Sequence, residues 1–124
     1  MARINYTTVG SNRLDEAKGF YDALLPLAGF APMSEHHSGG RAYGNPGGQI
    51  FAVLGTFDKN PATVGNGSMV AFAFDSREEI DAFHAKGLAL GGADEGAPGE
   101  RSPGVYFAYF RDLDGNKLCG YKIG

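Results

Sequence analysis

The sequence predicts an α+β fold in which a unit of one strand, one helix and further strands is used twice. Three observations carry this prediction: two amphipathic helical segments, several short strand-like segments between Gly, Pro, Asn and Asp residues, and a similarity of the chain to itself at an offset of 63 residues. Glycine accounts for 20 of the 124 residues, against a usual share of about 7%. We therefore expect glycines to mark the turns and helix ends of both units.

The first helix is expected to follow Asn12. Apolar side chains recur there at helical spacing on one face, at Leu14, Ala17, Phe20, Tyr21, Leu24 and Leu25. Asn12 is a candidate N-cap, because its side-chain oxygen can accept a hydrogen bond from a free backbone N–H of the first turn. Pro26 limits continuation of the helix.

The second helix is expected to follow Asp75. Ser76-Arg77-Glu78-Glu79 has the pattern of a capping box. Ile80, Phe83 and Leu88 then share one helical face, and Gly91-Gly92 supplies a stop.

The remaining segments predict strands, bounded by residues that favour turns. They are Ile4–Val9, Ala31–His36, Arg41–Gly44, Ile50–Leu54, Met69–Phe74, Val105–Phe110 and Lys117–Ile123. Tight hairpins are expected at Asn45-Pro46-Gly47-Gly48 and at Asp112-Leu113-Asp114-Gly115-Asn116. The segment Gly91–Gly104, rich in glycine and proline, is interpreted as a surface loop or a mobile lid.

An internal duplication relates the two halves. When the chain is shifted by 63 residues, Leu14–Phe30 falls on Arg77–Ala93, with identical residues at five positions. The pairs are Glu16/Glu79, Phe20/Phe83, Leu25/Leu88, Leu27/Leu90 and Gly29/Gly92. The order of elements and the place of the hairpins also match, which favours duplication.

Two of the strand segments lack polar alternation, so both of their faces require cover. In Met69–Phe74, one face carries Val70, Phe72 and Phe74 and the other carries Met69, Ala71 and Ala73. A face of small residues fits either a cavity or close packing against another element.

Composition limits the classes of partner that the protein can be expected to bind. Eleven Lys and Arg against fourteen Asp and Glu give a net charge of −3 without a basic run, so we expect no nucleic-acid partner. The single Cys119 excludes an internal disulfide. We see no signal peptide and no membrane-spanning segment, and we expect a cytoplasmic protein without membrane association.

The arrangement resembles the vicinal oxygen chelate superfamily, which includes glyoxalase I, extradiol dioxygenases and the bleomycin- and fosfomycin-resistance proteins. The matching stretches are Thr8-Val9-Gly10, Leu14-Asp15, Ala17-Lys18, Phe20-Tyr21-Asp22, Leu25 and Asp112-Leu113-Asp114-Gly115-Asn116-Lys117-Leu118. Pro61-Ala62-Thr63, Gly65-Asn66-Gly67, Ala71-Phe72, Pro98-Gly99 and Arg101 look like a bacterial glyoxalase-like branch. The resemblance covers essentially the whole chain.

The resemblance implies a single domain over residues 1–124, made of two βαβββ modules at about 1–57 and 66–124. It also implies mixed sheets curled around a pocket, helices on the outside, and a homodimer. In this family a divalent metal is held by His and Glu on the first and last strands of each module. The corresponding positions are Tyr6, Phe51, Met69 and Cys119. Because none is His, Asp or Glu, we expect no family-type metal and no other cofactor.

Several residues have alternative interpretations. His36 and His37 are either metal-binding or part of an exposed polar hairpin, and His84 is either a general base or a histidine on a helix flank. Cys119 is a small buried thiol unless Lys117 or Arg101 lies close enough to lower its pKa.

A pocket with polar groups in an apolar lining is typical of small-molecule sites. The candidate ligand-binding residues are Tyr6, Arg41, Phe51, Met69, Arg101, Tyr106, Tyr109 and Cys119, with Tyr43 and Arg111 as further polar side chains near them.

The favoured function is binding of a small organic molecule without the family metal, with no reaction assigned. Two alternatives stay open. The first is a metal-dependent isomerase or lyase like lactoylglutathione lyase, with His36 or His37 as a ligand. The second is an antibiotic-sequestering resistance protein.

Overall fold

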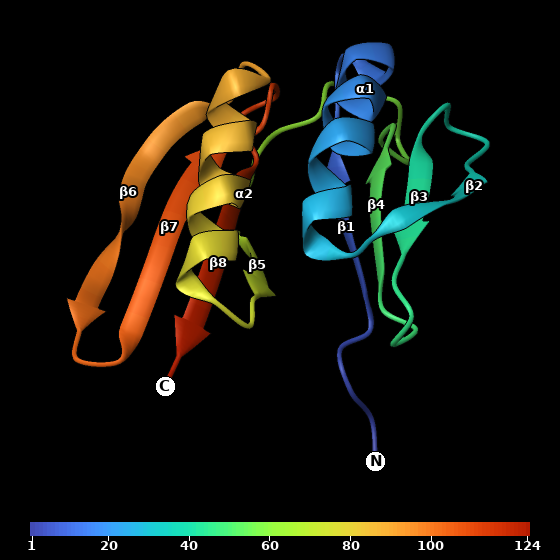
Figure 1. Cartoon of the computed structure of the whole chain (residues 1–124). Helices are drawn as coiled ribbons and strands as arrows, with labels where there is room; N and C mark the ends of the chain where they lie inside the picture. The colour runs from blue at the N-terminus through green and yellow to red at the C-terminus, as the bar shows by residue number, and fades with distance from the viewer.

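The structure is a computed structural model that describes residues 1–124, and it confirms the α+β class. The elements follow in the order β1 (Tyr6–Gly10), α1 (Leu14–Leu24), a 3-10 turn (Leu25–Ala28), β2 (Ala31–Glu35), β3 (Arg41–Gly44), β4 (Ile50–Leu54), β5 (Val70–Ala73), α2 (Arg77–Ala89), β6 (Ala93–Ser102), β7 (Val105–Arg111) and β8 (Lys117–Ile123). Each half of the chain therefore contains one βαβββ module, as the resemblance implies (Figure 1).

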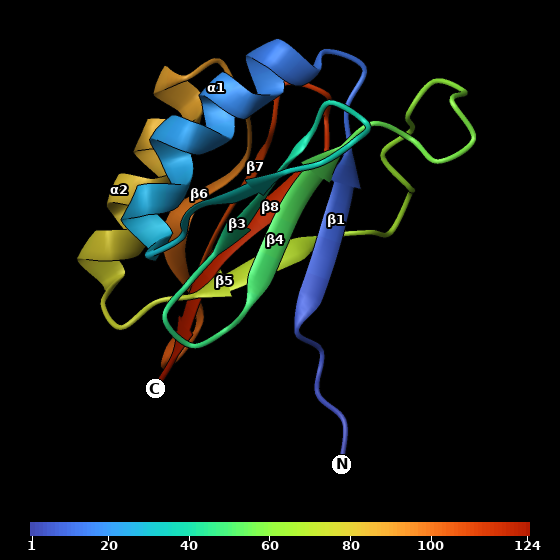
Figure 2. The ribbon, with the colours of Figure 1, turned by 90° about the vertical axis from the view of Figure 1, so that its right-hand side faces the viewer.

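Each module forms its own four-stranded sheet. The strand orders are β1-β4-β3-β2 and β5-β8-β7-β6. In both sheets the first strand pairs in parallel with the last strand of its module, and the other pairs are antiparallel. The helices lie on the same side of the molecule, next to each other (Figures 1 and 2).

The helix-facing sides of the two sheets share one hydrophobic core. Phe72 on β5 lies 5.9 Å from Phe51 on β4 and 5.7 Å from Phe30, measured between ring centroids. Phe83 on α2 joins the same cluster. The aromatic contacts between the modules mean that neither module buries its apolar face alone.

The opposite side of each sheet, here called its open face, is not covered by a helix (Figure 2). Strand alternation and the register define these faces. The open face of the first sheet carries Tyr6, Thr8, Ile50, Ala52 and Leu54. The open face of the second carries Ala71, Ala73, Phe107, Tyr109, Cys119 and Tyr121, with Met69 directly before β5. Ala71 and Ala73 are exposed, so the small-residue face predicted for this segment does not pack against another element of the chain.

A buried polar network joins the modules at the β7–β8 turn. The Tyr21 hydroxyl on α1 donates to Asp112 over 2.5 Å, and the Asn116 amide donates to the Gly10 carbonyl over 2.9 Å. Ser11 donates to Asp114 over 2.6 Å. Because burial makes an unpaired polar group costly, this network fixes how the second module sits on the first.

Two local predictions were wrong. Asn12 does not cap α1: its side chain binds both backbone groups of Ala62, and Ser11 Oγ accepts the Arg13 N–H instead. The segment Gly91–Gly104 is not mainly a loop, since Ala93–Ser102 forms β6. This edge strand pairs with β7 through several register shifts, where bulges accommodate glycine and proline.

Other local predictions were confirmed. Ser76 caps α2 by accepting the Glu79 N–H over 3.2 Å. The strands Arg41–Gly44, Ile50–Leu54 and Lys117–Ile123 have the predicted bounds, while the others shift by one or two residues at their ends. Neither helix has the length and apolar character needed to cross a bilayer.

Candidate functional site

The register corrects one of the four positions assigned to the family metal. Thr8 pairs with Ala52 in the first sheet, and Ala71 pairs with Cys119 in the second. Ala52 is therefore the counterpart of Cys119. The sequence-based choice of Phe51 counted from Gly47, whereas the turn glycine with positive φ is Gly48, the counterpart of Gly115. A one-residue slip moves a strand residue to the opposite face.

The corrected positions hold Tyr6, Ala52, Met69 and Cys119, a set that does not fit a hard divalent cation. Alanine has no donor atom, and the Met thioether favours soft metals. Nowhere in the chain do three or more His, Cys, Asp or Glu side chains gather closely enough to hold a metal ion. We therefore derive no chemical step through a metal at these positions.

Three of the predicted ligand-binding residues face the helices. Phe51 is 1% exposed, and its ring lies 4.9 Å from that of Tyr21. Arg41 pairs with Glu35 over 2.6 Å and with Asp22 on α1. Tyr106 donates its hydroxyl to Asp81 on α2 over 2.6 Å. These three side chains stabilise the packing of helix on sheet and do not line either open face.

The other five candidates lie at the open faces or beside them. Tyr6 is 54% exposed on the first sheet, and Met69 is 44% exposed at the start of the second. Tyr109 and Cys119 are paired neighbours on β7 and β8. The guanidinium of Arg101, on β6, lies 5.6 Å from the centre of the Tyr109 ring. The structure thus brings together Met69, Arg101, Tyr109 and Cys119 on the second sheet.

A hollow of about 530 Å³ opens beside these residues. Its lining includes Met69, Tyr109, Arg111 and Lys117. A second hollow of about 470 Å³ shares Met69 and Lys117 and continues toward β1. Neither lining contains an acidic side chain. A surface that combines apolar, polar and cationic groups is suited to a small organic ligand.

Cys119 is fully buried beneath this surface. Burial raises the pKa of its thiol to about 11, and the nearby charges of Lys117 and Arg101 offset this only in part. The side chain is therefore protonated at neutral pH. It contributes an apolar floor to the site and is not a poised nucleophile.

The prediction did not include three further residues of this surface. Phe107, Tyr121 and Lys117 all lie on the open face of the second sheet. Lys117, Cys119 and Tyr121 alternate along one predicted strand, so the period of two could have placed them on one face once Cys119 was chosen.

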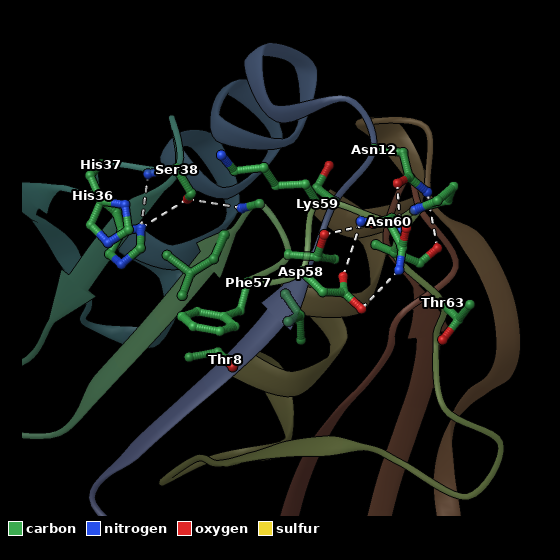
Figure 3. A pocket seen from close by; sticks show the side chains of 18 residues that line it. Thr8, Asn12, His36, His37, Ser38, Phe57, Asp58, Lys59, Asn60 and Thr63 are labelled. Atoms are coloured by element: carbon green, nitrogen blue, oxygen red, sulfur yellow. Dashed lines mark hydrogen bonds between the residues drawn. The ribbon is translucent and has the colours of Figure 1, made fainter.

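The largest cavity, of about 1310 Å³, lies elsewhere and contains none of the eight candidates. It is bounded by the ends of β1 and β4, the turn at 36–38 and the loop at 55–63 (Figure 3). His36 Nδ1 accepts the Ser38 N–H, and Asp58 accepts from Asn60. Asn12 is held by Ala62. These contacts occupy Asn12, His36 and Asp58, whereas the side chains of Thr8, His37, Lys59 and Thr63 form no hydrogen bond.

The three histidines have separate surroundings. The rings of His36 and His37 lie 4.1 Å apart in the β2–β3 turn, without a third ligand beside them. His84 is buried on α2, where its Nε2 lies 3.0 Å from Asp94 on β6. The His84 contact joins the second helix to the edge strand of its sheet.

Comparison with known proteins identifies relatives of this chain. Residues 3–119 match the family model described as the Glyoxalase/Bleomycin resistance protein/Dioxygenase superfamily. A crystal structure of a glyoxalase/bleomycin resistance protein from Albidiferax ferrireducens is 43% identical, with a TM-score of 0.86, covering 94% of this chain and 95% of that one.

More distant structures share the fold. A putative glyoxalase from Bacillus halodurans is 20% identical with a TM-score of 0.79, covering 98% of this chain and 96% of that one. A lactoylglutathione lyase from Agrobacterium tumefaciens is 21% identical with a TM-score of 0.70, covering 98% and 93%. No curated protein matches the chain.

Proposed function

Because the chain belongs to the glyoxalase/bleomycin resistance protein/dioxygenase superfamily, we propose that it binds a small organic molecule on the open face of its second sheet, without a divalent metal. The observation that carries this proposal has two parts. The second open face has a hollow beside the aromatic ring of Tyr109. The four positions that hold the metal in the family carry Tyr6, Ala52, Met69 and Cys119, which do not fit a hard divalent cation. No reaction is assigned, since the hollows have no histidine or carboxylate in their linings and burial keeps the Cys119 thiol protonated.

We further propose that the protein is a homodimer in which a second copy closes the open faces. The accessible surface of one chain is 6966 Å², compared with roughly 6,400 Å² for a compact monomer of this mass. Exposed Tyr6 and Met69 lie on these faces. Sedimentation at micromolar concentration is expected to give twice the mass of 13.1 kDa; a monomer would contradict the dimer.

The residues of the site also bear on the two alternative functions, the metal-dependent lyase and the antibiotic-sequestering protein. A metal-dependent lyase needs a ligand set, which the four positions lack. An antibiotic-sequestering protein for cationic drugs needs acidic groups, whereas the second open face carries Lys117 and Arg101. Turnover of the methylglyoxal–glutathione hemithioacetal that a chelator abolishes would favour the lyase. Heat on titration of a cationic glycopeptide would favour sequestration.

A thermal-shift screen of small organic compounds, carried out in EDTA, tests ligand binding directly. A compound that binds the folded state raises the melting temperature by several degrees when its concentration is about 100 times its Kd. The proposal expects such compounds, and it expects Ala71→Phe to abolish their effect, since Ala71 is exposed beside Cys119.

The matched control is Ala85→Phe, which adds the same ring at an exposed position of α2. It is expected to leave the shifts unchanged. Equal loss in both variants, or shifts that survive Ala71→Phe, would contradict binding on the second open face.

A further inference from the structure

Two of the three cations of the second open face, Lys117 and Arg101, lack carboxylate partners. Lys117, half-buried, forms no ion pair or hydrogen bond, and its Nζ lies 5.0 Å from the centre of the Tyr109 ring. Arg101 donates to the Gly99 and Ala97 carbonyls, which leave its charge unneutralised. Arg111, by contrast, is paired with Glu95 over 2.7 Å. Two positive charges therefore converge on one ring without a counter-charge.

The same ring belongs to an aromatic ladder, defined as Tyr109, Phe107 and Tyr121. Phe107 lies 5.8 Å from Tyr109 with the ring planes 19° apart, and 5.2 Å from Tyr121 with the planes 16° apart. Parallel rings on a partly exposed sheet face offer a surface on which a flat apolar body can pack.

The small residues beside the ladder leave room for that body. Ala71 and Ala73 are exposed on β5, and each pairs with a residue of β8 on this face, Cys119 and Tyr121. A separate hollow of about 530 Å³ adjoins the Tyr109 end of the ladder, where Met69, Arg111 and Lys117 also line it. The floor is apolar, because Cys119 is protonated.

We propose that the ligand of this face is a planar, apolar molecule that carries a carboxylate or a comparable oxyanion. The inference rests on the proposed function and specifies its ligand class. The oxyanion pairs with the Lys117 ammonium and the Arg101 guanidinium, which both lie next to the Tyr109 ring, and the planar body packs along the aromatic ladder. Charge-assisted hydrogen bonds from these two cations favour the anion over a neutral analogue.

Three probes separate the contribution of the ligand's ring from that of its negative charge. Benzoate has the ring and the charge, benzamide keeps the ring and removes the charge, and acetate keeps the charge and removes the ring. Chemical-shift titration of the ¹⁵N-labelled protein gives the dissociation constant and the location together. Benzoate is expected to bind about tenfold more tightly than benzamide, with shifts concentrated in β7 and β8, and acetate is expected to bind more weakly than benzoate.

Paired variants test the role of the cations. Lys117→Met keeps the aliphatic stem and is expected to weaken benzoate about tenfold while leaving benzamide unchanged. Lys122→Met is the control, because Lys122 lies on the same strand but on the opposite face, where it donates to the Gly124 carbonyl. Arg101→Gln is expected to weaken benzoate binding independently of Lys117→Met.

Several results would overturn the inference. Equal affinity for benzoate and benzamide, equal affinity for acetate and benzoate, or equal losses in Lys117→Met and Lys122→Met would each do so. If both aromatic probes shift β7 and β8 equally, the ligand class is wrong and the proposed function stands. If no probe shifts this face and compounds from the thermal screen still stabilise Ala71→Phe, both fail.

Discussion

The β3–β4 turn of the first module and the β7–β8 turn of the second share a backbone pattern and differ in surroundings. Asn45 N–H donates to the Gln49 carbonyl and Asn45 Oδ1 accepts the Gln49 N–H. Asp112 and Asn116 make the same two contacts. Yet the first turn is largely exposed, whereas Asp112 and Asn116 are buried against the other module. Equivalent turn chemistry thus serves a local role in one module and joins the two modules in the other.

The open faces differ in the same way. The first sheet presents Tyr6, Thr8 and Ala52, while the second presents the aromatic ladder beside two unpaired cations. The two modules share their strand order and backbone pairing, whereas the side chains on their open faces differ. Ligand chemistry is therefore expected to differ between the faces.

The largest expected effect is on the buried turn. Asp112→Ala removes the acceptor for the Tyr21 hydroxyl, the Asn116 amide and two backbone N–H groups. We expect the free energy of unfolding to fall by about 3 kcal/mol, because buried donors are left without partners. Urea denaturation measures this, and a loss no larger than that of Asn45→Ala would break the comparison.

The next effect concerns the floor of the second open face. With a pKa of about 11, Cys119 has a thiolate fraction at pH 8 that is roughly 200-fold below that of an ordinary cysteine with a pKa of about 8.5. Iodoacetamide is expected to react at least that much more slowly with the folded chain than with the chain in urea. Mass spectrometry follows the reaction, and comparable rates in both states would refute the buried, protonated thiol.

A smaller effect is expected from one member of the network. Tyr21→Phe removes only the hydroxyl, at a cost of about 1–2 kcal/mol. Burial and the Asp112 carboxylate raise the pKa of Tyr21 well above its usual value. The protonated hydroxyl therefore contributes stability below about pH 10, and this contribution is lost as the pH rises further. Stability of the wild type should fall more steeply above pH 10 than that of the variant; parallel curves would argue against this coupling.

The smallest effect is expected at the exposed turn. Asn45→Ala removes a side-chain acceptor that stays near water, so the loss should be about 0.5–1 kcal/mol. Urea denaturation alongside Asp112→Ala provides the ratio of the two losses. A ratio near one would mean that burial does not distinguish the turns.

Local patterns predicted most of the fold, because helix periodicity, the Ser76 cap and turn glycines act over a few residues. The duplication predicted the two modules. The failures depended on longer distances. The sequence pattern predicts Asn12 as a cap, but the loop after β4 brings Ala62 to its side chain. The composition of Gly91–Gly104 predicts a loop. The segment forms β6 because it pairs with β7, a contact that its own composition does not reveal.

The site was less predictable for the same reason. Tyr109, Cys119 and Arg101 were named from sequence, but only the register shows which side chains share a face. Counting from Gly47 instead of Gly48 selects Phe51 in place of Ala52, and this shift of one residue moves the predicted position to the opposite face of the sheet. Arg41 and Tyr106 have polar partners on the helices, Asp22 and Asp81, which strand patterns cannot identify.

We propose that the second open face binds an organic ligand without a divalent metal. Calorimetric titration of the best compound from the thermal screen tests it most directly, into protein treated with EDTA and into protein supplied with Mn²⁺, Ni²⁺ or Zn²⁺. We expect one dissociation constant in all conditions, with binding lost in Ala71→Phe and retained in Ala85→Phe. Binding that disappears in EDTA and returns with one equivalent of metal would contradict it.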